Sequence, residues 1–209
     1  MYRNIKLEKM MIDLGMDEKV PTAHQLWQTS NQFLIKGDLK NAKLYENLNH
    51  FLHNSSIPAS AKIGKNVNFG YGGIGIIIHK DCTVGDYVTI GSSVTLGGRT
   101  GSNVHYIDTF GKKKKVPKIG DYCYLATGSK ILGGVEIGGC SIIGANAVVL
   151  DHVPPCSVVV GSPGKIIATI HPENIQKYKN NFTRFRSMND EEIISILQSF
   201  STDVGNNDA

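Results

Sequence analysis

A six-residue spacing of aliphatic residues dominates the middle of this 209-residue chain. The aliphatic residues fall into two blocks: Ile78, Val84, Ile90 and Leu96, preceded by Ile63 and Phe69, and then Ile119, Leu125, Ile131, Ile137, Ile143 and Val149. A period of six matches neither the 3.6-residue turn of an α-helix nor the two-residue alternation of an ordinary strand. The repeat therefore predicts a solenoid of stacked short strands joined by corners.

One triangular turn of such a solenoid takes about eighteen residues, and successive turns stack at the ~4.8 Å spacing of paired strands. The aliphatic residue points inward, and the residue four positions later is also small or apolar, as at Cys82 and Ala147. Glycine follows many of the aliphatic residues, and we expect it to adopt corner dihedral angles that a Cβ would strain. His79 stands where this pattern places glycine. Residues 57–98 and 116–167 suffice for roughly five turns.

Two segments outside the repeat have helical patterns. Residues 22–53 carry apolar residues at helical spacing, interrupted at 36–38, and predict two helices with Trp27 in the core. Residues 172–200 predict one or two polar helices with an apolar stripe around Ile193 and Leu197. We expect both helical segments to cap the solenoid, because a stacked repeat needs covered ends. The expected fold is mainly β, with a helical N-terminal segment (1–56), the solenoid (57–167, with a loop at 99–117) and a C-terminal helical tail (168–209).

Composition argues against several classes of protein. The formal charge of +4 is too small to indicate a nucleic-acid binder, and no apolar run of about 18 residues predicts a membrane span. The N-terminus lacks the apolar stretch of a signal peptide. The cysteines Cys82, Cys123, Cys140 and Cys156 form no CxxC pair and are expected to be free buried thiols. Together these features predict a cytoplasmic protein.

Three stretches carry a family resemblance: VTIGSSVTLGG (88–98), PKIGDYCYLATGSKILGGVEIGGCSIIGANAVVL (117–150) and VPPCSVVVGSPGKII (153–167). They resemble the hexapeptide-repeat acyltransferases, in particular serine acetyltransferases and the related enzymes that O-acetylate bacterial surface sugars. The resemblance covers about residues 57–167. It implies a left-handed parallel β-helix, a homotrimer, and acetyl-CoA bound between neighbouring prisms, with no metal ion.

The catalytic residues of serine acetyltransferases do not carry over to this chain. Their Asp-His pair precedes a GIVIG-like segment, which is residues 75–79 here, so Tyr71 and Gly72 stand in the places of the pair. A second family histidine lies directly before the PKI sequence, where this chain has Val116. Many sugar O-acetyltransferases instead use a loop histidine after the VTLGG-like stretch, and His105 is the only histidine in the loop of this chain.

Acetyl transfer needs a general base that takes the proton of the attacking hydroxyl, and histidine serves this purpose near neutral pH. We expect His79 to be this base, because it interrupts the repeat beside the irregular corner at 71–75, with His105 assisting from the loop. Asp108 is expected to orient one of the two imidazoles. The reverse assignment, with His105 as the base and His79 as a corner residue, stays open.

The resemblance also assigns residues to acetyl-CoA. Lys165 falls where relatives hold a basic residue that meets the CoA phosphates. Four small residues match positions that line the pantetheine channel: Thr127, Gly128, Ala145 and Ser162. Backbone amides near Gly97 and Gly98 are suited to stabilising the oxyanion. The lysine run 112–115 is either a solvated loop or a site that attracts the CoA phosphates or an acidic glycan.

These features predict an acetyl-CoA-dependent O-acetyltransferase with active sites at trimer interfaces. We expect the acceptor to be a sugar hydroxyl of a bacterial surface polysaccharide or its precursor, with free serine as the alternative. Only 56 residues precede the repeat, whereas serine acetyltransferases usually carry a larger helical domain there. Residues 206–209 also lack the terminal isoleucine that docks into cysteine synthase.

Two other classes of function stay open. A zinc carbonic anhydrase on this scaffold needs converging histidines, and His79, His105 and His152 show no matching spacing. A structural solenoid without activity is the other possibility, and it would bind no acetyl-CoA.

Overall fold

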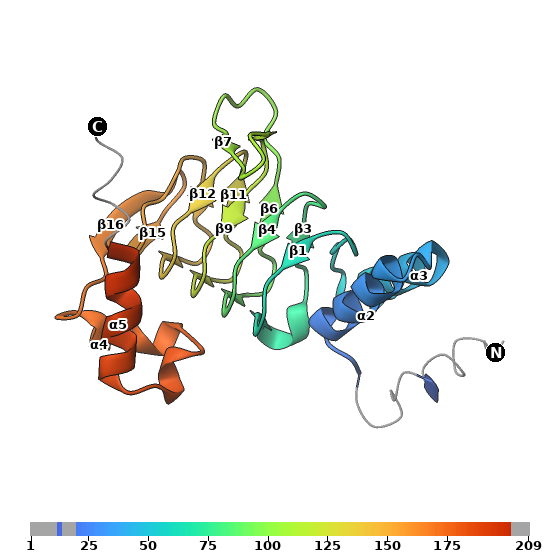
Figure 1. The fold of residues 1–209 in the computed structure, drawn as a ribbon, viewed down its shortest axis with the longest axis horizontal. Helices are drawn as coiled ribbons and strands as arrows, with labels where there is room; N and C mark the ends of the chain where they lie inside the picture. The colour runs from blue at the N-terminus through green and yellow to red at the C-terminus, as the bar shows by residue number, and fades with distance from the viewer. Residues whose placement is uncertain (1–11, 14–19, 202–209) are drawn as a thin grey trace.

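The computed structural model describes residues 12–13 and 20–201. Its centre is a prism of short parallel strands, with two helices at the N-terminal end and a helical segment at the C-terminal end (Figure 1). Residues 206–209, on which part of the acceptor prediction rests, lie outside the described residues. None of the described helices has the length and apolar character needed to cross a membrane.

The strands of the prism form three sheets, one for each of its faces. Face 1 consists of β1 (Lys62–Ile63), β4 (Thr83–Val84), β9 (Lys118–Ile119) and β12 (Glu136–Ile137). Face 2 consists of β2 (Asn68–Phe69), β5 (Thr89–Ile90), β10 (Tyr124–Leu125), β13 (Ile142–Ile143), β15 (Ser157–Val160) and an antiparallel last strand, β16 (Lys165–Thr169). Face 3 consists of β3 (Ile77–Ile78), β6 (Thr95–Gly97), β11 (Lys130–Leu132) and β14 (Val148–Val149). Successive strands of the repeat lie on successive faces, so the chain winds around the axis of the prism.

The repeat sets the register of the sheets. On face 2, Leu125 pairs with Ile143, eighteen residues later, as a turn of three six-residue units requires. Both side chains are fully buried inside the prism. The step from Phe69 to Ile78 is nine residues long, and a short 3-10 helix, η1 (Gly70–Gly73), takes up the additional length. The predicted parallel solenoid is therefore confirmed.

Glycine after the inward-pointing residue is needed for close packing and not for its dihedral angles, which corrects the expectation from the sequence. A Cβ on Gly91 would lie 2.6 Å from the backbone nitrogen of Thr127 in the next turn. A Cβ on Gly120 would lie 2.7 Å from the backbone nitrogen of Gly139. The left-handed backbone conformation occurs instead three residues after the aliphatic residue, as at Tyr122 with a φ of 56°.

The edge at which the chain passes from face 3 to face 1, hereafter the hairpin edge, has more room. The residues that follow the inward-pointing side chains of face 3 are His79, Gly97, Leu132 and Leu150. A Cβ on Gly97 would have its nearest neighbour at 3.8 Å, on the side chain of Leu132. The position after each inward-pointing residue of face 3 therefore has room for a large side chain, and His79 fits there.

The N-terminal helices cover one end of the prism, as the sequence predicts. They are α2 (Ala23–Ile35) and α3 (Leu39–His53). Thr22 and Gln25 form a capping box that satisfies backbone N–H groups at the start of α2. Trp27 is 7% exposed and belongs to the apolar core that continues into the prism. The indole is therefore a core residue, in agreement with its expected role.

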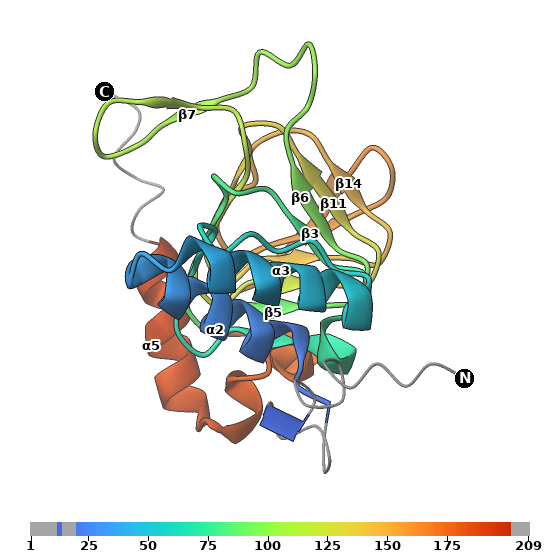
Figure 2. The same cartoon turned by 90° about the vertical axis from the view of Figure 1, so that its right-hand side faces the viewer.

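The C-terminal segment packs against the outer surface of face 2 instead of only covering the end of the prism. It contains α4 (Ile175–Tyr178), the 3-10 turns η2 (Lys179–Asn181) and η3 (Phe185–Ser187), and α5 (Asp190–Ser201). Ile193 and Leu197 from the predicted stripe are buried in one cluster with Ile142 and Val158 of face 2. Figure 2 shows no helix over face 3, so within the described residues this face keeps an open outer surface.

Candidate active site

Residues 99–117 leave the prism at the hairpin edge and form an antiparallel hairpin, β7 (Tyr106–Ile107) and β8 (Lys113–Lys114) (Figure 1). Tyr106 pairs with Lys114, and Ile107 pairs with Lys113. Because side chains alternate along a strand, the first pair faces the prism and the second faces away. Tyr106 is only 6% exposed, whereas Ile107 is 59% exposed. The sequence predicts a loop here, although its Asp-Thr-Phe-Gly turn between two short segments is a hairpin signal.

Gly134 fixes the base of the hairpin against the next turn of the prism. A Cβ at this position would lie 2.6 Å from the Cα of His105 and 2.8 Å from the carbonyl oxygen of Val104. It would also meet the carbonyl oxygen of Lys114. Glycine therefore lets both strands of the hairpin rest directly on the prism, and this contact places His105.

His79 follows β3, and backbone hydrogen bonds hold it in place. Its N–H donates to the carbonyl oxygen of Leu96 (2.8 Å), and its carbonyl accepts from the N–H of Cys82 (3.0 Å). The ring nitrogen Nδ1 accepts a hydrogen bond from the backbone N–H of Asp81 at 3.2 Å. The Asp81 carboxylate lies 3.8 Å from the same nitrogen. An acceptor nitrogen carries no proton, so the proton of the neutral ring is on Nε2 and His79 is arranged as a donor there.

His105 has the opposite arrangement. Its Nδ1 lies 2.7 Å from the carbonyl oxygen of Asn103, which can only accept, so Nδ1 carries the proton. The lone pair of the neutral ring is then on Nε2. This is the arrangement that a general base requires, because Nε2 can accept the proton of a substrate hydroxyl. The hydrogen bonds of the two rings therefore favour the reverse of the expected assignment, with His105 as the base.

Asp108 closes the turn of the hairpin. Its carboxylate accepts hydrogen bonds from the backbone N–H groups of Phe110 (3.0 Å) and Lys112 (2.9 Å), and it lies 3.4 Å from Nζ of Lys114. The hydrogen bond from Lys112, helped by those from Phe110 and Lys114, lowers the pKa of this carboxyl group. Among the described residues its hydrogen-bond partners include neither His79 nor His105. In this structure Asp108 holds the hairpin turn, and its expected role toward an imidazole stays a prediction.

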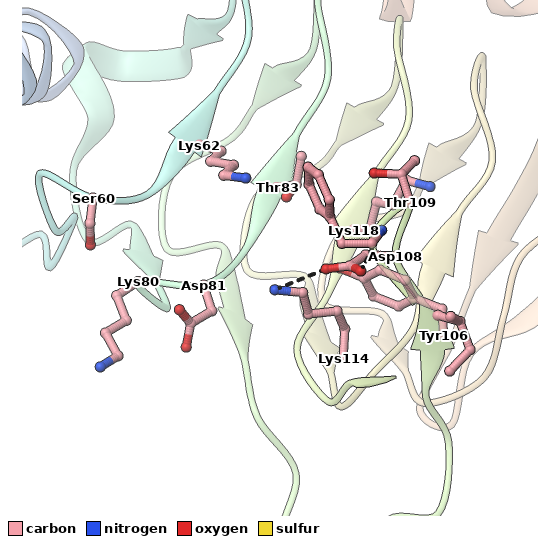
Figure 3. Close-up of a pocket in the computed structure, with 12 residues that line it drawn as sticks. Ser60, Lys62, Lys80, Asp81, Thr83, Tyr106, Asp108, Thr109, Lys114 and Lys118 are labelled. Carbon is pink, nitrogen blue, oxygen red and sulfur yellow. Dashed lines mark hydrogen bonds and ion pairs between the residues drawn. The ribbon is translucent and has the colours of Figure 1, made fainter. Parts of the chain in front are cut away.

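A cavity of about 350 Å³ lies under the hairpin, over face 1 (Figure 3). Its walls include Lys62 and Thr83 from face 1, Lys80 and Asp81 from the hairpin edge, and Tyr106 and Lys114 from the hairpin. His79 directly precedes Lys80, and His105 directly precedes Tyr106. Neither histidine lines the cavity itself, but each is the chain neighbour of a wall residue. Apart from the lysine run, no sequence pattern marks these wall residues, because they come from distant parts of the chain.

The residues predicted to line the pantetheine channel share a different edge. At this edge, hereafter the Thr127 edge, the chain passes from face 2 to face 3. Thr127 and Gly128 belong to one turn, Ala145 to the next and Ser162 to the last. The carbonyl of Thr127 accepts a hydrogen bond from the N–H of Asn146 at 3.0 Å, which stacks the turns in register. Thr127, Ala145 and Ser162 are exposed, so the edge presents small side chains to solvent.

Lys165 lies at the C-terminal end of the Thr127 edge. It begins β16, opposite Val160, and its side chain is exposed. Lys165 lies beside β14 of face 3, and β3, which directly precedes His79, is three strands further along that sheet. Along the axis of the prism, β14 and β3 are therefore separated by three strand spacings, or about 14 Å. Gly97 and Gly98 lie instead on the hairpin edge, and a Cβ on Gly98 would meet nothing within 4 Å.

The predicted residues thus form two groups within one chain. The histidines and Gly97 lie on the hairpin edge, whereas the channel residues lie on the Thr127 edge, and the width of face 3 separates the two edges. In the part of the chain that the structure describes, no group of three or more His, Cys, Asp or Glu side chains is placed to hold a metal ion. The four cysteines are buried free thiols.

Comparison with known proteins identifies the repeat. Residues 117–151 match the family described as bacterial transferase hexapeptide (six repeats). Together with the three-faced parallel prism, this match places the chain among the hexapeptide-repeat transferases. Within that class its relatives include serine acetyltransferases.

The serine acetyltransferase of Staphylococcus epidermidis is 44% identical over 126 residues, which cover 60% of this chain and 54% of the relative. That of Staphylococcus aureus is 39% identical over 150 residues, covering 69% and 64%. A solved serine acetyltransferase in complex with cysteine superposes with a TM-score of 0.63 at 26% identity, over 77% of this chain and 56% of that one. The Brucella abortus serine acetyltransferase in complex with coenzyme A gives 0.61 at 28% identity, over 70% and 55%. The chain therefore spans between 54% and 64% of the length of these relatives.

Proposed function

We propose that this protein is an acetyl-CoA-dependent O-acetyltransferase, built as a left-handed β-helix and active in the cytoplasm, where acetyl-CoA is available. One observation carries the proposal: a scaffold shared with serine acetyltransferases combines an open edge of small residues with a histidine whose Nε2 is free to take a proton. A related structure with this fold contains coenzyme A. The shared fold supports the scaffold, and the relative with bound coenzyme A supports acetyl-CoA as the acetyl donor.

The identity of the acceptor is inferred mainly from the relatives of this chain. Their names favour serine over the hydroxyl of a surface polysaccharide, which reverses the order expected from the sequence. A sugar hydroxyl is the second candidate, because Tyr71 and Gly72 stand in the places of the family's Asp-His pair. Tyr71 has a left-handed backbone with a φ of 53° and is 79% exposed. It offers a phenol and not an imidazole at that corner.

The two histidines suit complementary steps of acetyl transfer. His105 would accept the hydroxyl proton at Nε2 while the hydroxyl oxygen attacks the thioester carbonyl carbon, and would then return that proton to the departing thiolate of CoA. His79, with its proton on Nε2, and the amides near Gly97 and Gly98 are suited to donating hydrogen bonds to the oxyanion.

The separation of the two edges supports a homotrimer with shared sites. One chain presents its histidines on the hairpin edge and its channel residues on the Thr127 edge, so a complete site needs the hairpin edge of one copy beside the Thr127 edge of another. Face 3, between the two edges, carries the exposed side chain of Ile77 (46%). The open face and the divided site both support an assembly of several copies.

A thiol-release assay tests the proposal. The purified protein is mixed with acetyl-CoA and, in parallel, with serine or with neutral and acidic monosaccharides, and free CoA is measured with a thiol reagent. We expect acceptor-dependent release of CoA, with serine tested first, and loss of that release in His105→Ala. Absence of release with every acceptor, together with no acetyl-CoA binding by calorimetry, would indicate a structural solenoid instead.

A further inference from the structure

The cavity under the hairpin has an excess of positive charge. Four lysines and two aspartates line it. Lys118 is committed elsewhere, because its Nζ lies 2.7 Å from the carboxylate of Glu136. Asp81 turns toward His79 and is 56% exposed, so it is well solvated. Among the described residues, Lys62 and Lys80 have no carboxylate partner.

The direction of the side chains selects two of these lysines. Figure 3 shows Lys62 and Lys114 extending their amino groups into the space between face 1 and the hairpin, whereas Lys80 points away from it. Lys114 is the partly buried member of the 112–115 run, with a side chain that is 26% exposed. Its distance of 3.4 Å to Asp108 is longer than the roughly 2.8 Å of a strong charge-assisted hydrogen bond. Lys114 therefore has donors left for another anion.

Neutral hydrogen-bond donors add to this arrangement. Burial, with smaller contributions from nearby acidic groups, raises the pKa of Tyr106 to about 12, so its hydroxyl stays protonated at physiological pH. Thr83 contributes a second hydroxyl to the wall. Tyr106 is the buried member of the wall, whereas Lys62 and Lys80 are exposed, so the excess of ammonium groups and not exclusion of water is what attracts an oxyanion here. Such surroundings suit a small anionic group better than a neutral sugar.

We propose that this cavity binds the oxyanion group of the acceptor, a carboxylate or a phosphate, between the amino groups of Lys62 and Lys114. The role of the bound molecule as acceptor rests on the proposed function, whereas the anion site stands on the geometry of the cavity alone. His79 and His105 do not line the cavity but directly precede its wall residues Lys80 and Tyr106, so an acceptor anchored here by its charge would extend its hydroxyl out of the cavity toward them. The site therefore selects acidic acceptors over neutral ones.

Calorimetry with inorganic phosphate tests the anion site directly, without any acetyl transfer. We expect Lys62→Gln and Lys114→Gln each to weaken phosphate binding by about tenfold, because each removes one charge-assisted contact. Lys113→Gln is the matched control, since it removes the same charge from the same hairpin on its outward side. Its affinity should stay within about twofold of the unaltered protein. Equal losses in all three variants, or no phosphate binding by the unaltered protein at low salt, would overturn the proposal.

Paired acceptors then distinguish the sources of the oxyanion. CoA release is compared for serine and serinamide, for glucuronic acid and glucose, and for glucose 6-phosphate and glucose. The acidic member of at least one pair should have the higher kcat/KM, and Lys62→Gln with Lys114→Gln should remove that preference. A preference that survives in the double variant contradicts the inference even if acetyl transfer is robust. Phosphate binding with no acetyl transfer would instead contradict the proposed function and leave the anion site intact.

Discussion

The Nδ1–H of His105 donates to the carbonyl oxygen of Asn103 at 2.7 Å, and this contact leaves Nε2 of His105 as a proton acceptor. In His79, by contrast, Nδ1 accepts from the backbone N–H of Asp81. The backbone of the loop and that of the hairpin edge thus set different tautomers in two rings, each of which directly precedes a wall residue of the cavity in the chain. Because a tautomer decides which nitrogen can take a proton, the two histidines should respond differently to substitution.

His105→Ala should lower kcat by about 10²-fold or more, because it removes the proton acceptor. His79→Ala should lower kcat less, by the loss of one donor. His50→Ala, on an exposed position of α3, should leave kcat unchanged. Steady-state kinetics with saturating acetyl-CoA makes the comparison. Near-normal turnover of His105→Ala with an inactive His79→Ala would restore His79 as the base.

The tight edge at Gly91 and the roomier hairpin edge at Gly97 should differ in how well they tolerate an added methyl group. Gly91→Ala should lower the free energy of unfolding by about 1–3 kcal/mol, because its Cβ would lie 2.6 Å from the backbone nitrogen of Thr127. Gly97→Ala should change it by less than about 0.5 kcal/mol, since its nearest neighbour is at 3.8 Å. Urea denaturation of the two variants provides the measurement. Similar losses in both would show that the hairpin edge is as tightly packed as the others.

Asp108 makes the hairpin sensitive to acid. Its pKa is lowered in the folded protein, mainly by the hydrogen bond from the N–H of Lys112, so the stabilisation is fully present above the ordinary pKa of about 4. It is lost as pH falls through the lowered folded value. Hydrogen exchange at the amides of Phe110 and Lys112, corrected for the intrinsic rate, should therefore accelerate below about pH 4. Asp108→Asn should exchange faster at neutral pH and lack this acid step; a matching acid step in that variant would assign the effect to another group.

Lys165 should act on acetyl-CoA binding alone. If its ammonium meets the CoA phosphates, Lys165→Ala raises the KM for acetyl-CoA several-fold and leaves kcat nearly unchanged, as loss of uniform binding requires. Lys177→Ala, on the short helix α4, removes the same charge away from the Thr127 edge and serves as the control. Initial rates over a range of acetyl-CoA concentrations separate the two parameters. An unchanged KM would place the nucleotide end elsewhere.

If each active site is shared between two subunits, two inactive variants should complement each other. His105→Ala removes the base on the hairpin edge, and Ala145→Arg, at an exposed position, obstructs the Thr127 edge. Each alone should be inactive, whereas co-expression should restore part of the activity, because mixed assemblies contain some sites with both edges intact. Light scattering should give a mass near three times 22.7 kDa. A monomer, or no restored activity in confirmed mixed trimers, contradicts the divided site.

The sequence by itself determines the prism. One inward-pointing side chain every six residues leaves a single register in which residues such as Leu125 and Ile143 are buried, so the strand order follows from the spacing. The two N-terminal helices and the buried face of α5 follow in the same way from helical periodicity. These features depend on residues close together in the chain, so a local pattern in the sequence is enough to predict them.

Only the tertiary structure decided the site. Lys62 and Lys114 lie in distant parts of the chain, and the hairpin brings them to one cavity. The room that His79 occupies depends on which backbone lies in the next turn, and the tautomer of His105 depends on the direction of the Asn103 carbonyl. The role of glycine at the tight edges depends on the same kind of contact, because the backbone of the next turn is what leaves no room for a Cβ. Contacts between turns, and the orientation of single carbonyl groups, leave no periodic trace in a sequence, because each is set by atoms that meet only after the chain has folded.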